Sequence, residues 1–176
     1  MKPDKELFLI DANILITPQE QYYPFDLAPN FWVQMAEKIE EGSIVILDMV
    51  KGEILVSDEK DDLAHWFDNL NIGNYIDHRQ PDILSKYSEI LQSIQNNPCY
   101  TEKALTAWAQ EKVADPWLIA TASVHGFTLI TIEKRANELN QHYPSGKPKI
   151  PNVASDFNVL VEDLFYMMRK LQIKLT

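Results

Sequence analysis

Four acidic residues lie where a parallel α/β sheet would gather them. Three follow predicted strands, directly or within a few residues, and one opens a predicted helix; they are Asp11, Glu53, Asp115 and Glu133. In open parallel sheets, ligands bind beside the carboxyl ends of the strands. Carboxylates that meet there cannot all ionise without a cation, and Mg²⁺ or Mn²⁺ prefers such oxygen ligands. The sequence therefore predicts a divalent-metal site suited to phosphoryl chemistry.

Each of these acids also has a purely structural interpretation. Asp11 lies in "DAN", which could form an Asx turn. Asp115 could simply cap its helix, although capping does not exclude metal binding. Glu53 could be a solvated helix residue, and Glu133 could pair with one of the two basic residues that follow it. The metal site is therefore predicted only if all four side chains converge.

Other candidate residues are interpreted as structural. Asp48 and Asp156 follow predicted strands, and we expect Asp48 to cap the helix that carries Glu53 and Asp156 to cap the last helix. The histidines are scattered without metal-ligand spacing, so we assign none a catalytic role; they are His65, His78, His125 and His142. The tryptophans lie on predicted helix faces, where core packing is expected.

Apolar periodicity predicts the elements that must position the acids. The strands are expected over 7–11, 43–48, 127–131 and 149–154, and the helices over 30–41, 49–56, 81–97, 101–113, 115–126 and 156–172. Prolines at 18, 24 and 29 predict a loop after the first strand. Alternating strands and helices predict an α/β fold with three layers, α/β/α, around a short parallel sheet.

The chain shows no internal linker, so we expect a single domain over residues 1–176. A helical, acidic insertion is expected around residues 57–100. Its part near Trp66 and Phe67 could alternatively be a lid or a partner-binding helix.

Composition and charge limit the classes of function. The net charge of −10 argues against a nucleic-acid partner. However, residues 1–133 carry −13 and residues 134–176 carry +3, so the C-terminal part could still contact phosphates. The single Cys99 excludes an intramolecular disulfide and a cysteine-based zinc site. We find no glycine-rich phosphate loop, no apolar stretch of membrane-spanning length and no signal peptide, so we expect a cytoplasmic protein.

Four motifs, taken together and in order, resemble the PIN-domain ribonucleases. They are "LIDANILI", "VKGEI", "ADPWLIATA" and "LITIEKR", within a likeness that covers about residues 7–160. By this resemblance Asp11, Glu53, Asp115 and Glu133 are the catalytic and metal-binding acids. Asn13 and Thr131 match the flanking polar positions of the family. The resemblance also implies the family's three-layer, Rossmann-like topology.

The resemblance implies a Mg²⁺-dependent (or Mn²⁺-dependent) endoribonuclease, most often the toxin of a VapC-like toxin–antitoxin pair. The implied partners are an RNA substrate, a small antitoxin and a second copy of the chain that could dock through the helices of 81–113. RNA phosphates could be held by basic residues near the acids; the candidates are Lys51, Lys134, Arg135, Lys147 and Lys149.

Two other functions stay open from the sequence. The first is a catalytically silent PIN-like module that binds protein or RNA, because Glu133 stands where the family more often has aspartate. The second is a flavodoxin-like or receiver-like binding domain, against which the wide spread of the acids argues.

Overall fold

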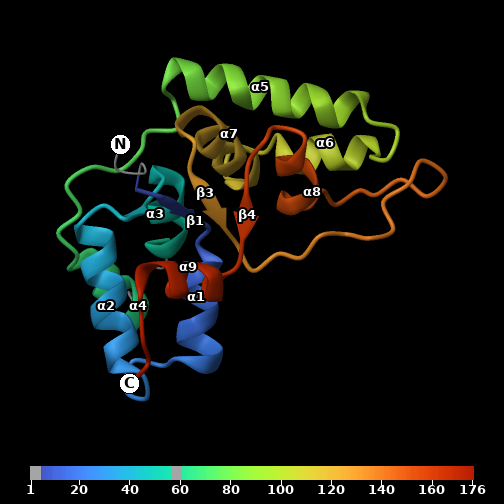
Figure 1. Ribbon diagram of the computed structural model, residues 1–176. Helices are drawn as coiled ribbons and strands as arrows, with labels where there is room; N and C mark the ends of the chain where they lie inside the picture. Colours follow the sequence, from blue (N-terminus) through green and yellow to red (C-terminus); the bar gives the residue numbers. More distant parts are fainter. Residues whose placement is uncertain (1–4, 57–60) are drawn as a thin grey trace. The chain divides into compact units, whose positions relative to one another are not determined.

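The computed structural model, which describes residues 5–56 and 61–176, has an α/β fold (Figure 1). Its strands are β1 (Phe8–Ile10), β2 (Ile44–Val45), β3 (Thr128–Ile130) and β4 (Val161–Glu162). They form an all-parallel sheet in the order β2-β1-β3-β4. The register of the first pair sets Phe8 opposite Ile44 and Leu9 opposite Val45. The predicted α/β class and parallel sheet are confirmed, in keeping with three layers.

The helices occupy most of the rest of the described chain. In order they are α1 (Asn13–Thr17), the π-helical turn η1 (Pro18–Tyr22), α2 (Pro29–Glu40), α3 (Asp48–Ile54), α4 (Asp62–Asp68), α5 (Pro81–Asn96), α6 (Glu102–Trp108), α7 (Asp115–His125), α8 (Ile150–Ser155) and α9 (Leu164–Leu171). None of the helices in the described ranges combines the length and the apolar character that a membrane crossing needs.

The described residues cluster into two compact units. Unit 1 holds the chain up to Asp77 together with Ile130–Ile132 and Glu162–Thr176. Unit 2 holds His78–Leu129 and Glu133–Val161. The single domain expected over 1–176 stays a prediction, and the expected insertion around 57–100 contributes residues to both units.

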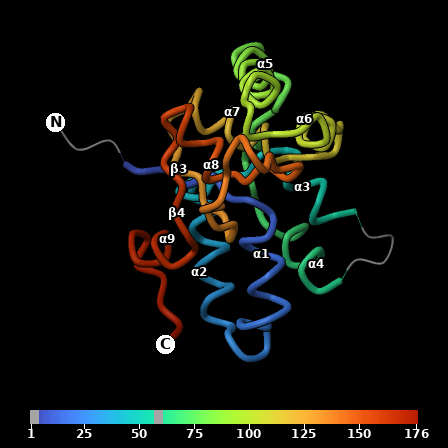
Figure 2. Tube along the Cα trace, turned by 90° about the vertical axis from the view of Figure 1, so that its right-hand side faces the viewer, coloured from blue at the N-terminus to red at the C-terminus, as the bar shows by residue number. Residues whose placement is uncertain are grey.

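Unit 1 is built on β1, whose three apolar side chains are buried, and on β2, in which Ile44 is buried and Val45 is partly buried. Figure 2 shows the chain of this unit leaving β1, passing through α1 and η1 and turning back into α2. An aromatic cluster stabilises that turn: the Trp32 indole donates a 2.6 Å hydrogen bond to the Tyr23 carbonyl, and its ring lies 4.9 Å from that of Trp66. Trp66 therefore packs inside the unit, as aromatic rings at helical spacing usually do.

Unit 2 is built on α7, whose residues Pro116–Ala122 are all buried. α5 packs along α7 and also contacts α6 (Figure 1). Tyr87 of α5 stacks on Trp117 of α7, with ring centroids 3.7 Å apart and an interplanar angle of 10°. Gly126 ends α7 in the left-handed region with φ of 73°, a conformation that glycine adopts without strain.

The predicted strand over 149–154 is wrong, because this segment forms α8. Pro151 lies in the first turn of α8, where its fixed φ suits a helix and its missing N–H costs nothing. The fourth strand is instead β4, and Thr131 N–H donates a 3.2 Å hydrogen bond to its Glu162 carbonyl. Short apolar runs such as "IPNVA" fit a strand and a helix equally well in periodicity.

Two related predictions also need correction. The last helix was expected over 156–172 but spans only α9, and its cap is Asp163, which accepts a 2.8 Å hydrogen bond from Tyr166 N–H. Asp156, predicted as that cap, follows the C-terminal end of α8. The loop expected after the first strand is largely helical, because Pro18 begins η1 directly after α1.

The segment after β3 is fastened to α8 by a buried amide. Asn152, 7% exposed, accepts a 2.9 Å hydrogen bond from Ala136 N–H and donates a 3.0 Å hydrogen bond to the Ala136 carbonyl. Since this pairing satisfies both backbone polar groups of Ala136, it fixes the segment that carries Glu133.

We expect Asn152→Leu to lower the free energy of unfolding by about 1–3 kcal/mol, because the Ala136 peptide groups would lose buried partners. Urea denaturation measures the change. Asn137→Leu, at an exposed position of the same segment, is the control and should change stability by less than about 0.5 kcal/mol. Equal effects of the two substitutions would contradict the role assigned to Asn152.

Candidate functional site

Asp11 is a buried carboxylate at the carboxyl end of β1, only 5% exposed. Its N–H donates a 3.0 Å hydrogen bond to the Ile130 carbonyl, and its own carbonyl accepts a 3.0 Å hydrogen bond from Ile14 N–H. The residue therefore ends the strand and begins the turn into α1. The hydroxyl of Thr131, itself 2% exposed, donates a 3.1 Å hydrogen bond to Asp11 Oδ2.

This pair lies at the point where the strand order reverses. β2 lies on one side of β1 and β3 on the other, so the strand order reverses between β1 and β3. Asp11 follows β1, and Thr131 follows β3. Crevices at such switch points, outside the carboxyl ends of the strands, are the usual ligand sites of open α/β sheets. Thr131 is thus placed beside Asp11, and a buried carboxylate occupies the position that the topology favours for a ligand.

A third position at the same edge of the sheet carries Asp48, the first residue of α3. The β1–β2 register places it one residue beyond the level of Asp11. Its Oδ1 accepts a 2.8 Å hydrogen bond from Met49 N–H, in line with a role near the start of the helix. The prediction that Asp48 caps this helix is therefore wrong: Leu47 is at the cap position, and Asp48 is the first residue of the helix itself.

Residues 74–77 return beside β2 and bring a second carboxylate to Asp48. Ile76 bridges to Leu47 in parallel, with hydrogen bonds of 2.9 Å from Asp48 N–H to the Ile76 carbonyl and 3.0 Å from Ile76 N–H to the Ile46 carbonyl. Asp77 follows at once. Two carboxylates this close repel unless a proton or a cation lies between them.

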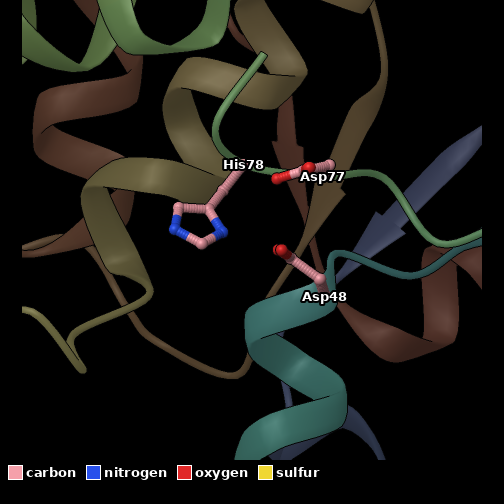
Figure 3. A group of neighbouring side chains, drawn as sticks. All are labelled: Asp48, Asp77 and His78. Atoms are coloured by element: carbon pink, nitrogen blue, oxygen red, sulfur yellow. The ribbon is translucent and has the colours of Figure 1, made fainter.

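The chain then places His78 next to Asp77. One possible ligand atom from each of Asp48, Asp77 and His78 lies within 4.8 Å of the others, and Figure 3 shows the three side chains pointing toward one another. Sequence reasoning missed this group: Asp77 drew no attention, and His78 was set aside because its partner lies 30 positions away. The signal that could have found it is the short strand-like "YID" before the histidine.

The other predicted residues of unit 1 are exposed. Glu53 lies near the end of α3 and lines a pocket of about 280 Å³ with residues of α1, η1 and α4, including Glu20 and Asp61. Asn13 is the exposed first residue of α1. Lys51 is exposed, and its ammonium lies 4.7 Å from the centre of the Tyr75 ring.

Unit 2 carries the remaining predicted acids. Asp115 is the partly buried first residue of α7, after Ala114 at the cap position. Glu133 is held by α8: its Oε2 accepts a 2.8 Å hydrogen bond from Ile150 N–H, and its Oε1 lies 3.3 Å from the ammonium of Lys149. Lys149 is thus one ion-pair partner of Glu133.

The basic candidates of unit 2 surround the same segment. Arg135 reaches back to α8, with 3.3 Å to the Pro151 carbonyl and 3.4 Å to Ser155 Oγ. Lys134 and Lys147 are exposed, and Lys149 is partly buried beside Glu133. Lys134 and Lys147 are thus open to solvent. Arg135 contacts α8 and Lys149 contacts Glu133, and both contacts hold the segment against α8.

We expect Thr131→Val to lower the free energy of unfolding by about 1–2 kcal/mol, because a buried carboxylate loses a hydrogen-bond donor. Thr131→Ser, which keeps the hydroxyl, should recover most of the loss. Chemical denaturation of both variants measures the difference. A valine variant as stable as the serine variant would show that the contact with Asp11 contributes nothing.

The comparisons with known proteins name one family and no activity. A search of curated proteins and a search of solved structures each returned no match. A family described as "Domain of unknown function (DUF4411)" matches residues 8–175, nearly the whole chain, from β1 to beyond α9. The chain therefore belongs to the DUF4411 family.

Proposed function

We propose that this protein is a metal-dependent endoribonuclease of the PIN-like type, acting through Mg²⁺ or Mn²⁺. The observation that carries the proposal is the buried Asp11 at the switch point of the parallel sheet, oriented by the Thr131 hydroxyl. A buried carboxylate is costly unless hydrogen bonds and a cation balance its charge. The motif likeness and the parallel fold support the same function.

The donor set suits a hard divalent ion. Asp11, Glu53 and Asp115 would hold it, since carboxylate oxygens are the ligands that Mg²⁺ prefers. Asp48 supplies a further carboxylate at the same edge of the sheet as Asp11. When bound, the ion would favour hydrolysis of a phosphodiester by activating water and stabilising the leaving oxygen.

The role that we propose for Glu133 differs from that of the other three acids. The resemblance makes it the fourth acid, but both of its carboxylate oxygens contact the Lys149 ammonium or the Ile150 N–H. These contacts already balance part of its charge. We therefore propose that Glu133 chiefly fixes the segment with Lys134 and Arg135 and that its remaining lone pairs add to the metal set.

The partners follow from the same proposal. An RNA strand would contact exposed lysines through its phosphates, with Lys134 and Lys147 as the candidates in unit 2. A small antitoxin that covers the acids, a homodimer through the helices of 81–113 and a cytoplasmic location belong to the toxin version of the proposal.

The second candidate is a catalytically silent module that binds protein or RNA. The observation that favours it is the engagement of Glu133 in structural contacts. Such a module would not lose metal binding on Asp11→Asn, whereas the nuclease would. Isothermal calorimetry of Mn²⁺ binding to the wild type and to Asp11→Asn distinguishes the silent module from the nuclease.

We expect the purified protein to cleave labelled single-stranded RNA in Mg²⁺ or Mn²⁺ and to stop in EDTA. Asp11→Asn should lower the rate by about 100-fold or more, because the amide cannot supply the charge that the ion needs. Gel electrophoresis of the products measures both effects.

Asp26→Asn is the matched control, because Asp26 is an exposed acid of unit 1 outside the proposed site, and it should cleave at the wild-type rate. Cleavage that continues unchanged in Asp11→Asn, or in EDTA, contradicts the proposed mechanism.

A further inference from the structure

Two side-chain pairs meet at the edge of unit 1, where α3 begins. Lys51 lies three residues after Asp48 on α3, so both project from the same face of the helix, one turn apart. Tyr75 and Asp77 lie two residues apart in the strand-like segment that bridges to Leu47, so they share a face of that segment. Lys51 contacts Tyr75 where Asp48 faces Asp77.

The ring of Tyr75 is well placed to hold the lysine. It is partly buried and lies 6.4 Å from the ring of Phe67, which is 1% exposed. Burial, and the nearby charge of Asp68, raise the pKa of the Tyr75 hydroxyl, so the phenol stays neutral at physiological pH. A neutral, fixed ring attracts an ammonium through its face.

Holding Lys51 in one place prepares it for a ligand. A free lysine side chain has many rotamers, and a ligand that binds it must pay for ordering them. The contact with Tyr75 removes part of that cost beforehand, while the side chain as a whole stays exposed. Lys51 also belongs to a part of the chain that is acidic as a whole, since residues 1–133 carry a net charge of −13.

We propose that Lys51, held over the ring of Tyr75, is a phosphate contact for RNA, with Tyr75 as its positioning residue. The inference rests on the proposed nuclease function and deepens it. The phosphate would lie one helical turn from Asp48. It would therefore be near the edge of the sheet that carries Asp11 and Asp48. Lys51 draws the polyanion to an otherwise acidic surface, and Tyr75 sets where it binds.

The test compares variants at both positions for binding to a fluorescein-labelled, 12-nucleotide RNA by anisotropy in EDTA, at several salt concentrations. Lys51→Gln should weaken binding about fivefold to tenfold and reduce the salt slope by about 0.7, the value for one phosphate contact to a single strand. Lys51→Arg should stay near wild type.

The Tyr75 variants separate positioning from mere support of the fold. Tyr75→Phe keeps the ring and should bind RNA within about twofold of wild type, whereas Tyr75→Leu should bind about threefold more weakly. In the cleavage assay, Lys51→Gln should raise KM and leave kcat unchanged. Thermal unfolding of every variant confirms that it is folded.

Lys86→Gln is the matched control, because Lys86 also lies over an aromatic ring, 5.9 Å from the centre of Phe157, but belongs to unit 2 and pairs with Glu89. It should leave the salt slope unchanged. If the wild type cleaves and binds RNA while Lys51→Gln has the wild-type affinity and slope, the inference fails alone. If the wild type neither binds RNA in EDTA nor cleaves it in Mg²⁺ or Mn²⁺, both the inference and the proposed function fail.

Discussion

The hydrogen bond from the Thr131 hydroxyl to the buried carboxylate of Asp11 is the contact on which the account of this protein depends. It joins the ends of the two inner strands, β1 and β3, at the place where the strand order reverses. A carboxylate is rarely buried unless its charge is balanced. The burial of this carboxylate at the switch point is therefore the main support for the proposed metal site.

The rest of the sheet edge follows from the same geometry. β2 delivers Asp48 one residue beyond the level of Asp11, and the returning segment 74–77 delivers Asp77 beside Asp48. Acidic side chains thus gather at the carboxyl ends of β1 and β2. The basic Lys51 is placed among them by an aromatic ring rather than by an acid. This is the edge at which we propose that a cation and an RNA phosphate bind.

Much of the fold could be predicted because its elements are locally consistent. "FLI" before Asp11, the proline and glycine at the two ends of α7 and the apolar spacing of α2 each point to the observed element. The segment 149–154 was wrongly predicted as a strand, because six residues that include a proline fit a helix start as well as a strand edge. β4 was missed since it has only two residues, too few for an alternating pattern.

The candidate site was predictable only where local sequence decides it. The end of β1 fixes Asp11, and Thr131 follows β3 in the same way, so both could be placed in advance. The pairing of Asp48 with Asp77, and of Glu133 with Lys149, depends on how distant segments return, which no local pattern encodes. The most direct test of the central claim is the anomalous scattering of crystals grown in Mn²⁺. The account predicts a peak beside the carboxylate of Asp11 that is lost in Asp11→Asn. Fully ordered crystals in millimolar Mn²⁺ without a peak at Asp11 would contradict it.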